Sequence, residues 1–381
     1  MSRTLKLPYL AESGDALTIA AKSMLVFVGS HLVLRILRTS VRPRVTLKLV
    51  PMVTVISLMW PVAAHAEPFR LIITESVTPL VPNSVLELAL EFGYFRREGV
   101  EVRLIRVDQT PLAVAGLVSG DGDMANISIE SVMHLAARGQ RQWKAVVVPN
   151  KSLPFLIAAR RGITSLADLA GRIFGVGRIG SLDHSLSASV LRSRGVDPAF
   201  INFVSIGQPQ MRAQALAMRR IDATTVSTGT WIGLAERVDL HVLVPQKEYF
   251  AAAPLINKVN VVSSKAMVEK RSEVLAVVTA LIKASRDFER NPRDWVSAMR
   301  KLRPDVTQET LASLAATFAK SWSVNGGMNA RELQYTADWL YQSPDFKDVP
   351  RIQPTEWIDF SVADEVLSRI GIDPSSDEPV R

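Results

Sequence analysis

Three glycines in the middle of the chain have the spacing of a phosphate-binding loop. Gly175, Gly177 and Gly180 match G-x-G-x-x-G, after an apolar segment and before a helical pattern. In a dinucleotide site such glycines permit a tight turn and the close approach of a pyrophosphate. That site also needs an acidic residue at the end of the next strand, where this chain has Gly207 and Gln208. The motif therefore favours a ligand-binding loop over a nucleotide site.

The residues around this loop offer groups that could contact a ligand. Ser181 is a good N-cap for the helix that follows, and free N–H groups at a helix start can bind ligand oxygens. Arg178 adds a cation, whereas Asp183 in the first turn already satisfies the positive helix end. We expect Arg178, Gly180, Ser181 and His184 to contact a ligand. The alternative is an ordinary capped helix.

Further polar residues follow other expected strands. In an open α/β sheet, ligands bind beyond the carboxyl ends of the strands. Routine turn and capping chemistry is the competing explanation for each of these residues. The strand-end residues that we expect to bind ligand are Glu75, Ser76, Thr78, Asn126, Ser128, Ser227, Thr228 and Trp231.

No pattern in the sequence indicates catalysis or a metal. The chain has no cysteine, which excludes a thiol nucleophile, a disulfide framework and a lipid anchor on an N-terminal cysteine. His134, His184 and His241 show no metal-ligand spacing, and neither G-x-S-x-G nor S-x-x-K occurs. We therefore predict no catalytic residue, no metal and no cofactor, and a protein that is not an enzyme.

Strand and helix patterns alternate, which indicates parallel-rich sheets covered by helices. In the first part we expect strands at 69–74, 100–107, 124–127 and 143–148, and helices at 83–92, 111–118 and 131–138. A second unit starts near Pro154, with strands at 173–176, 201–205 and 221–226 and a helix at 182–194. The chain returns to the first unit at 256–262, and then helices are expected at 266–290, 292–301, 308–318 and 330–341, before a disordered tail at 373–381.

Four segments, in this order, carry a family resemblance. They are GYFRREGVEVRLIRV at 93–107, LVSGDGDMAN at 117–126, TSLADLAGR at 164–172 and QALAMRRIDA at 214–223. The chain resembles, over about residues 68–325, bacterial solute-binding proteins of the nitrate/sulfonate/taurine type, a group that includes thiamine-precursor binders. In the last segment Arg219 or Arg220 stands where the family has glycine, which puts the geometry of that turn in question.

The resemblance implies a type II periplasmic binding protein with two α/β lobes and a helical C-terminal extension. Lobe one would comprise 67–152 plus 256–381 and lobe two 153–255, joined by a hinge of two crossing strands. Such a protein, expected to be monomeric, closes around a small molecule and delivers it to the permease of an ABC transporter in the inner membrane. A secreted enzyme or a ligand-sensing module of the same fold is the alternative.

The ligand class stays open at this stage. Arg178 favours an anion such as a sulfonate, whereas Glu75, Glu130 and Asp183 favour a cationic or amine-bearing compound. Trp231 is compatible with an aromatic ring, as in a pyrimidine-like compound.

The N-terminus has the features of a cleavable secretory signal. Arg42, Arg44 and Lys48 precede an apolar run at 49–60, and Ala64-His65-Ala66 is a small-x-small cleavage site. The extra residues 1–41 indicate a start site assigned too early. Residues 1–66 carry eight basic and two acidic residues, so the net charge of +8 falls to +2 after their removal. The charge therefore does not indicate a nucleic-acid partner.

We predict export to the periplasm and cleavage after Ala66, because the basic region, the apolar run and the cleavage site occur in the required order. N-terminal sequencing of the periplasmic protein should begin at Glu67. Recovery of an uncleaved chain from the cytosol would contradict this prediction.

Overall fold

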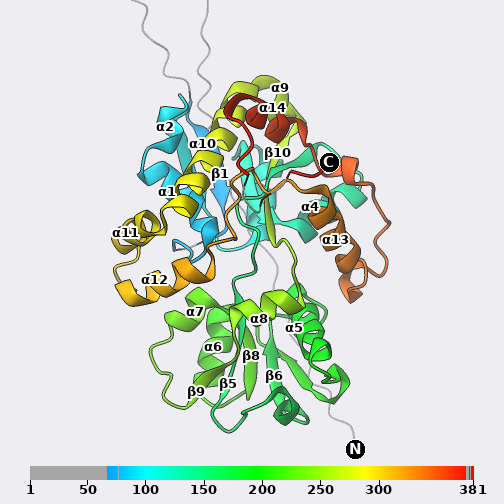
Figure 1. The fold of residues 1–381 in the computed structure, drawn as a ribbon. Coiled ribbons are helices and arrows are strands. Elements are labelled where there is room, and N and C mark those ends of the chain that lie inside the picture. The colour runs from blue at the N-terminus through cyan, green and yellow to red at the C-terminus, as the bar shows by residue number, and fades with distance from the viewer. Residues whose placement is uncertain (1–66, 76, 375–376, 378) are drawn as a thin grey trace, which may run out of the picture. The chain divides into compact units, whose positions relative to one another are not determined.

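The computed structural model describes residues 67–75, 77–374, 377 and 379–381. The proposed signal region and Ser76 lie outside the described residues. The described residues belong to one compact unit that contains two five-stranded sheets. We call the unit built on the first sheet lobe one and that built on the second sheet lobe two (Figure 1).

The first sheet mixes parallel and antiparallel strands. Its order is β2-β1-β3-β10-β4, in which β1 pairs with β2 and β3 in parallel and β10 pairs with β3 and β4 antiparallel. β10 joins this sheet only after the chain has passed through lobe two. Its strands are β1 (Phe69–Ile73), β2 (Val102–Arg106), β3 (Met124–Ser128), β4 (Trp143–Val147) and β10 (Lys258–Ser263).

The second sheet repeats this arrangement within one continuous segment. Its order is β7-β6-β8-β5-β9, with β6 parallel to β7 and β8, and β5 antiparallel to β8 and β9. Its strands are β5 (Phe155–Arg160), β6 (Ile173–Val176), β7 (Asn202–Ser205), β8 (Ala223–Ser227) and β9 (Leu240–Val244).

Helices cover both sheets. Those of lobe one are α1 (Val85–Glu91), α2 (Tyr94–Arg97), α3 (Thr110–Ser119), α4 (Ile129–Ala137), α9 (Ser264–Glu269), α10 (Arg271–Arg290), α11 (Pro292–Leu302), α12 (Gln308–Thr317), α13 (Ala330–Leu340) and α14 (Ser361–Ile370). Those of lobe two are α5 (Leu182–Ser193), α6 (Pro209–Ala217), α7 (Thr228–Ile232) and α8 (Gln246–Ala252). Short 3-10 helices occupy Pro82–Ser84, Leu166–Leu169, Pro198–Phe200, Pro344–Phe346 and Pro354–Glu356.

Each sheet is buried on both faces, because successive side chains of a strand point to opposite sides. In β1, Leu71 and Ile73 belong to one hydrophobic cluster and Ile72, between them, to another. In β5, Ile157 and Leu156 likewise pack into separate clusters. This double burial explains why the strands read as continuous apolar runs instead of alternating ones.

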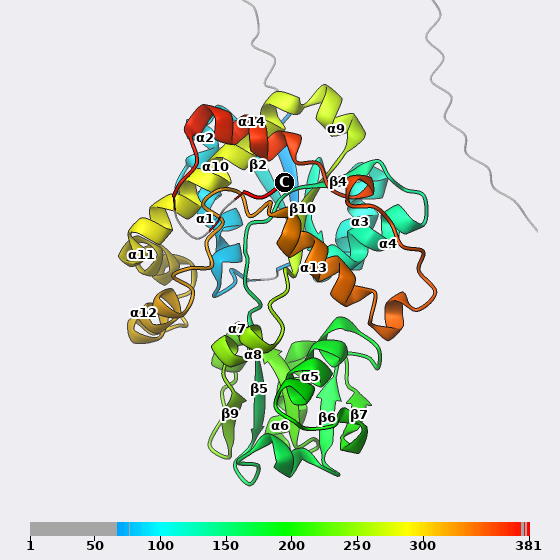
Figure 2. The ribbon, with the colours of Figure 1, turned by 45° about the vertical axis from the view of Figure 1, so that its right-hand side comes forward.

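The two lobes are joined by two stretches of chain. Residues 148–154 connect β4 to β5, and residues 253–257 connect α8 to β10. Both run between the lobes in Figures 1 and 2. The expected crossing strands are thus irregular segments. In the first, the Asn150 side chain bonds the backbone N–H and C=O of Ser152, both at 3.0 Å, and this turn interrupts a strand.

The sequence patterns find most elements and misplace a few. The expected strand at 173–176 has the observed limits of β6, and the helix expected at 182–194 is α5. β5 and β9 are not among the strands expected from the sequence. The single helix expected at 266–290 is two helices, α9 and α10, which meet at Lys270. The backbone of Lys270 has φ −129°, outside the helical region, so the chain bends there although its side-chain pattern is continuous.

The tail at 373–381 was expected to be disordered, but its described residues contact lobe one. Asp377 is 2% exposed and accepts hydrogen bonds from the N–H groups of Asn325 (2.7 Å) and Gly327 (3.1 Å). Its carboxylate also pairs with Lys151 of the first connecting segment at 3.1 Å. Composition suggested disorder, but the aspartate satisfies backbone groups that would otherwise be buried without partners.

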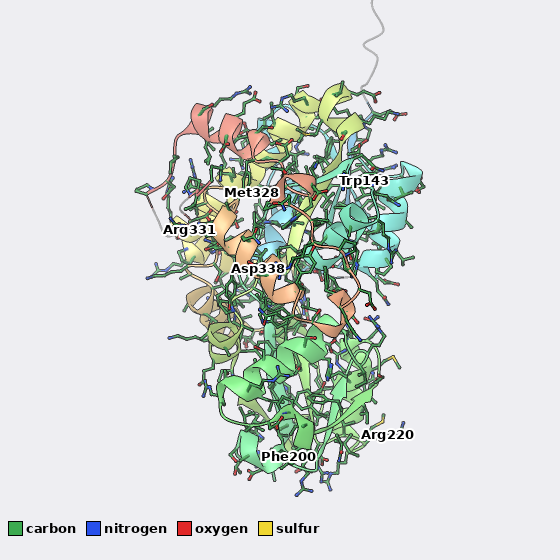
Figure 3. The ribbon with its side chains drawn as sticks, turned by 90° about the vertical axis from the view of Figure 1, so that its right-hand side faces the viewer. Trp143, Phe200, Arg220, Met328, Arg331 and Asp338 are labelled. Carbon is green, nitrogen blue, oxygen red and sulfur yellow. The ribbon has the colours of Figure 1, made fainter. Side chains whose placement is uncertain are left out.

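The family's missing glycine is replaced by Arg219. Among the described residues, Arg219 is the one non-glycine with positive φ, at 57°. The turn between α6 and β8 therefore keeps the left-handed geometry that glycine would adopt freely. The neighbouring Arg220 lies at the end of lobe two remote from lobe one (Figure 3).

We predict that Arg219→Gly raises the free energy of unfolding by roughly 0.5–1 kcal/mol. Glycine releases the backbone strain of the left-handed conformation, and part of this gain is offset because glycine increases the entropy of the unfolded chain. The exposed Arg219–Asp239 ion pair is lost but contributes little. Chemical denaturation of the variant measures this gain. Arg220→Gly is the matched control and should not stabilise; equal effects at the two positions would contradict the assignment.

Candidate functional site

A cavity of about 340 Å³ lies between the lobes. One wall comes from the loop that follows β1 and from Arg303, and the other comes from α6, α7 and the end of β8. The residues that line it are Glu75, Val77, Thr78, Pro79, Leu80, Val81, Pro154, Gln210, Ala213, Gln214, Ser227, Gly229, Thr230, Gly233, Leu234 and Arg303.

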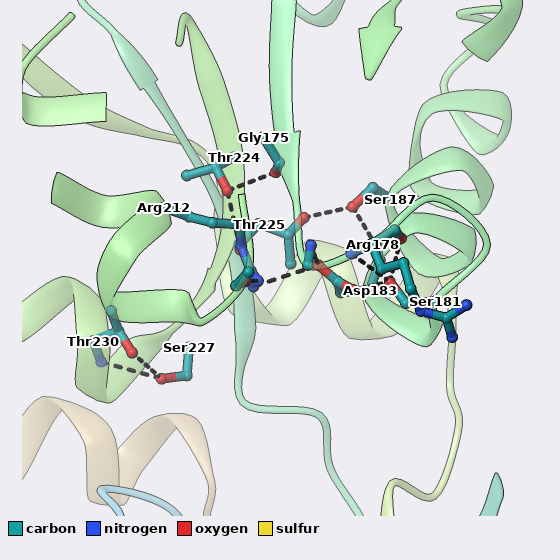
Figure 4. A network of polar contacts seen from close by, with 12 residues as sticks. Gly175, Arg178, Ser181, Asp183, Ser187, Arg212, Thr224, Thr225, Ser227 and Thr230 are labelled. Atoms are coloured by element: carbon teal, nitrogen blue, oxygen red, sulfur yellow. Dashed lines mark hydrogen bonds and ion pairs between the residues drawn. The ribbon is translucent and has the colours of Figure 1, made fainter. Parts of the chain in front are cut away.

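The wall from lobe two offers neutral polar groups. Ser227 begins α7 and accepts a hydrogen bond from the Thr230 N–H at 3.1 Å (Figure 4). Gln210 and Gln214 project from α6 into the lining, and their side-chain amides have no hydrogen-bond partner among the described residues. Two amides are therefore available to a ligand, each with a donor and an acceptor end.

The wall from lobe one contains charges that are already paired. Arg303 is buried and binds both carboxylate oxygens of Asp305, at 2.8 and 2.6 Å, while a third nitrogen donates to the Thr78 carbonyl at 2.9 Å. The Lys258 ammonium lies 2.5 Å from the Glu75 carboxylate and also donates to Thr74 Oγ1 at 2.8 Å. These contacts fix the loop that follows β1.

Thr78 is held by a second ion pair. Its hydroxyl donates to the Glu87 carboxylate, which also receives two hydrogen bonds from Arg106 at 2.9 and 2.7 Å. Glu87 is buried at 5% exposure, so its charge requires this partner. Thr78 thus lines the cavity with its hydroxyl hydrogen already committed.

The glycine loop uses its own N–H groups internally. The N–H of Gly177 donates to Asp183 at 2.7 Å, that of Ile179 to Ser205 Oγ at 3.2 Å, and that of Gly180 to His184 Nδ1 at 3.0 Å. The loop therefore offers no open cradle for phosphate oxygens. Gly180 has φ 87°, a conformation that suits glycine.

The expected capping role of Ser181 is wrong. Ser181 is the N-cap residue of α5, but its hydroxyl makes no capping hydrogen bond to the helix. Its oxygen lies 2.5 Å from both the Arg178 carbonyl and Asp183 Oδ1, which compete for its one hydrogen. The same oxygen accepts from the Arg178 N–H at 3.2 Å, so the hydroxyl faces the loop and not the helix N–H groups.

Sequence reasoning missed a buried arginine beneath this loop. Arg212, on α6, is 4% exposed, lies 3.4 Å from Asp183 and donates to the carbonyls of Gly207 (2.5 Å) and Thr225 (3.1 Å) (Figure 4). Burial lowers the pKa of Arg212, and Asp183 opposes that shift. Arg212 ties α6 to the loop and to β8. In the sequence, Arg212 is only an arginine on an expected helix, and such a residue usually has a solvent-exposed side chain.

Away from the cavity, an ion pair connects the two lobes. Arg178 pairs with Asp345 of the 3-10 helix Pro344–Phe346 at 3.0 Å. Nearby, burial raises the pKa of the Glu130 carboxyl, Asp345 adds to this shift and Arg178 opposes it. Glu130 lies 4.0 Å from His134 on the same helix. Burial also lowers the pKa of His134, so Arg178–Asp345 is the ion pair of this region and Glu130 and His134 do not form a second one.

Three of the expected ligand residues line the cavity: Glu75, Thr78 and Ser227. Asn126 is fully buried in β3 and donates to Asn260 Oδ1 at 2.8 Å, so its expected place in the site is wrong. The cross-strand register of β3 with β10 puts these two amides opposite each other, which engages them in the core.

The remaining expected residues have other contacts. Ser128 caps α4 by accepting from the Ser131 N–H at 3.3 Å, and Thr228 donates to the Pro154 carbonyl at 3.0 Å. Trp231 lies beside Arg237 at the outer part of α7. Ligand contacts by Ser128, Arg178, Gly180, Ser181, His184, Thr228 and Trp231 stay predictions; none of these residues lines the cavity.

The lining combines hydroxyls, amides and aliphatic groups, which suits reversible binding of a small molecule. In the described part of the chain, no cluster of three or more His, Asp or Glu side chains could hold a metal. No helix in that part is long and apolar enough to cross a membrane.

Comparison with known proteins identifies the family. The sequence model described as NMT1/THI5 like matches residues 84–294, more than half of the chain, and the protein belongs to this family. No curated protein sequence matches the chain.

Solved structures show the same two-lobed fold of periplasmic binding proteins. The ligand-binding component of an ABC-type import system from Staphylococcus aureus, with zinc bound, is 14% identical with a TM-score of 0.63, over 79% of this chain and 99% of that one. The periplasmic aliphatic sulphonate binding protein SsuA from Escherichia coli is 16% identical with a TM-score of 0.58, over 77% and 92%. The desulfurization enzyme DSZB is also 16% identical with a TM-score of 0.58, over 79% and 99%.

We predict a histidine contribution to the pH dependence of stability. Burial lowers the pKa of His184 below its usual 6.5, and Arg192 adds to this shift. Below pH 6.5 the unfolded chain therefore binds a proton that the folded protein does not, so stability falls as pH falls. His184→Asn, which can still accept from the Gly180 N–H, should reduce this loss between pH 7.5 and 5.5 in denaturant unfolding. An unchanged slope would contradict the prediction.

Proposed function

We propose that this protein is the extracytoplasmic solute-binding subunit of an ABC importer. The observation that carries the proposal is the cavity between the lobes, with two unpartnered glutamine amides on one wall and hydroxyl and aliphatic groups around them. The family and the names of the similar structures support the same role. The ligand would be a small organic solute.

The mechanism is closure of lobe two onto lobe one. Residues 67–152 with 256–381 and residues 153–255 would move as two bodies about the connecting segments. A ligand that contacts Gln214 from one side and the Thr78–Val81 loop from the other gains all its contacts only in the closed state. Binding then favours closure by that difference in affinity. The closed protein would present the surface recognised by the permease.

The proposed location follows from this role. Cleavage after Ala66 would release a monomeric protein into the periplasm, without a lipid anchor because the chain has no cysteine.

We predict that a polar metabolite extract of the source bacterium contains the ligand. Adding it should raise the melting temperature and reduce the radius of gyration in small-angle scattering, because ligand contacts join both lobes. The bound compound, released by denaturation, should have the same mass as before binding. A compound altered by the protein would indicate an enzyme, and binding without a permease among co-purified partners would favour a sensing module.

Gln214→Ala tests the placement of the site. Loss of a ligand hydrogen bond of about 0.5–1.5 kcal/mol should weaken binding of the extracted compound several-fold. The melting temperature should change little, because the amide has no partner within the described protein. Gln342→Ala, an exposed amide outside the cavity, is the matched control. Unchanged affinity in the Gln214 variant would place the site elsewhere.

A further inference from the structure

The charges around the cavity form closed pairs. Among the described residues, two that line the cavity carry charge, Glu75 and Arg303. Each is bound by an opposite charge from its own lobe at 2.5–2.8 Å. Two charge pairs behind the walls are likewise formed within one lobe, Glu87 with Arg106 and Asp183 with Arg212. Arg178 and Asp345 pair across the lobes, away from the cavity.

This pairing disfavours a charged ligand. An ion that enters a closed cleft loses its hydration and needs an opposite charge or several charge-assisted hydrogen bonds in return. Arg303 already directs donors to both Asp305 oxygens and to the Thr78 carbonyl. The loop N–H groups of Gly177 and Gly180, which could otherwise bind an anion, donate to Asp183 and His184.

The groups that remain available are neutral. They are the amides of Gln210 and Gln214, beside the Ser227 and Thr230 hydroxyls, which hydrogen-bond each other at 2.9 Å. The aliphatic surface comes from Pro79, Leu80, Val81, Ala213 and Leu234. An amide offers a donor and an acceptor side by side, which matches a ligand with the same pair of groups. We infer that the ligand is a compact, uncharged compound with amide-like donors and acceptors on an apolar frame, and not a sulfonate or another anion. This inference rests on the proposed function.

The Arg303–Asp305 pair provides a way to reverse this selectivity. Arg303 is 9% exposed at its side chain, whereas Asp305 is 55% exposed. Asp305 can therefore be changed without opening the core, and Asp305→Asn leaves the guanidinium at the cavity wall without its counter-charge. An anion then replaces the lost carboxylate as the acceptor for Arg303.

The test separates the extract into anionic, neutral and cationic pools by ion exchange at pH 7 and measures the melting temperature with each. The neutral pool should stabilise the wild-type protein, and butane-1-sulfonate should not bind. Asp305→Asn should gain roughly tenfold in affinity for butane-1-sulfonate, as expected for a new charge-assisted contact. Asp348→Asn removes an exposed carboxylate outside the cavity and should show no gain.

The outcomes separate the two proposals. Stabilisation of the wild type by the anionic or cationic pool alone would overturn the inference and leave the solute-binding role intact. No response to any pool would contradict solute binding itself and the inference with it. If Asp305→Asn folds and binds butane-1-sulfonate no better than the wild type, Arg303 does not control the charge selectivity, and the inference fails on that ground.

Discussion

The insertion of β10 between β3 and β4 is the constraint on which the two-lobed arrangement depends. The strand returns from lobe two and makes antiparallel ladders on both sides, with Asn260 opposite Asn126 in one of them. A central strand cannot be withdrawn without exposing two rows of backbone groups. Because β10 neighbours β4, the outgoing and returning connections leave lobe one from adjacent strands. Lobe two is therefore connected to lobe one by two segments that lie next to each other.

Lobe two is attached at the matching position of its own sheet. β5, the first strand after the crossing, pairs with β9, the last strand before α8 and the return. The outgoing connection therefore enters lobe two at β5, and the return leaves it from α8, which directly follows the neighbouring strand β9. Motion about such a pair of segments requires backbone rotation in a few residues and leaves both sheets intact. The tail residue Asp377 contacts Lys151 in the first segment, so the C-terminus also helps to position this connection.

The polar chemistry near the interface follows from burial. Arg212, Glu87 and Arg303 are buried, and each is stabilised by an opposite charge. The partners are Asp183, Arg106 and Asp305 respectively. The glycine loop shows the same rule for backbone groups, since its N–H donors bond Asp183, Ser205 and His184. A loop with the spacing of a phosphate site is thus a self-contained turn. The groups that remain for a ligand are the uncharged ones of α6 and α7 that line the cavity.

The alternation of strands and helices can be predicted from the sequence, because apolar periodicity depends only on neighbours along the chain. The sequence predicted the two α/β units, strands such as β6 and the family resemblance. It missed β5 and the break at Lys270, where hydrophobic pattern and backbone conformation do not agree. Of the candidate site, Glu75, Thr78 and Ser227 were predictable from their positions after strands.

Which polar groups already have a hydrogen-bond or ion-pair partner depends on the tertiary structure. The sequence shows Arg178, Ser181 and Asn126 as equally available, but their partners Asp345, Asp183 and Asn260 are assigned by packing between distant segments. In the same way, Gln210 and Gln214 carry no sequence signal, and they become candidates because α6 presents them to the cavity without partners. Hydrogen-bond and charge pairing is a property of three-dimensional neighbours, so periodicity and motif spacing cannot specify it.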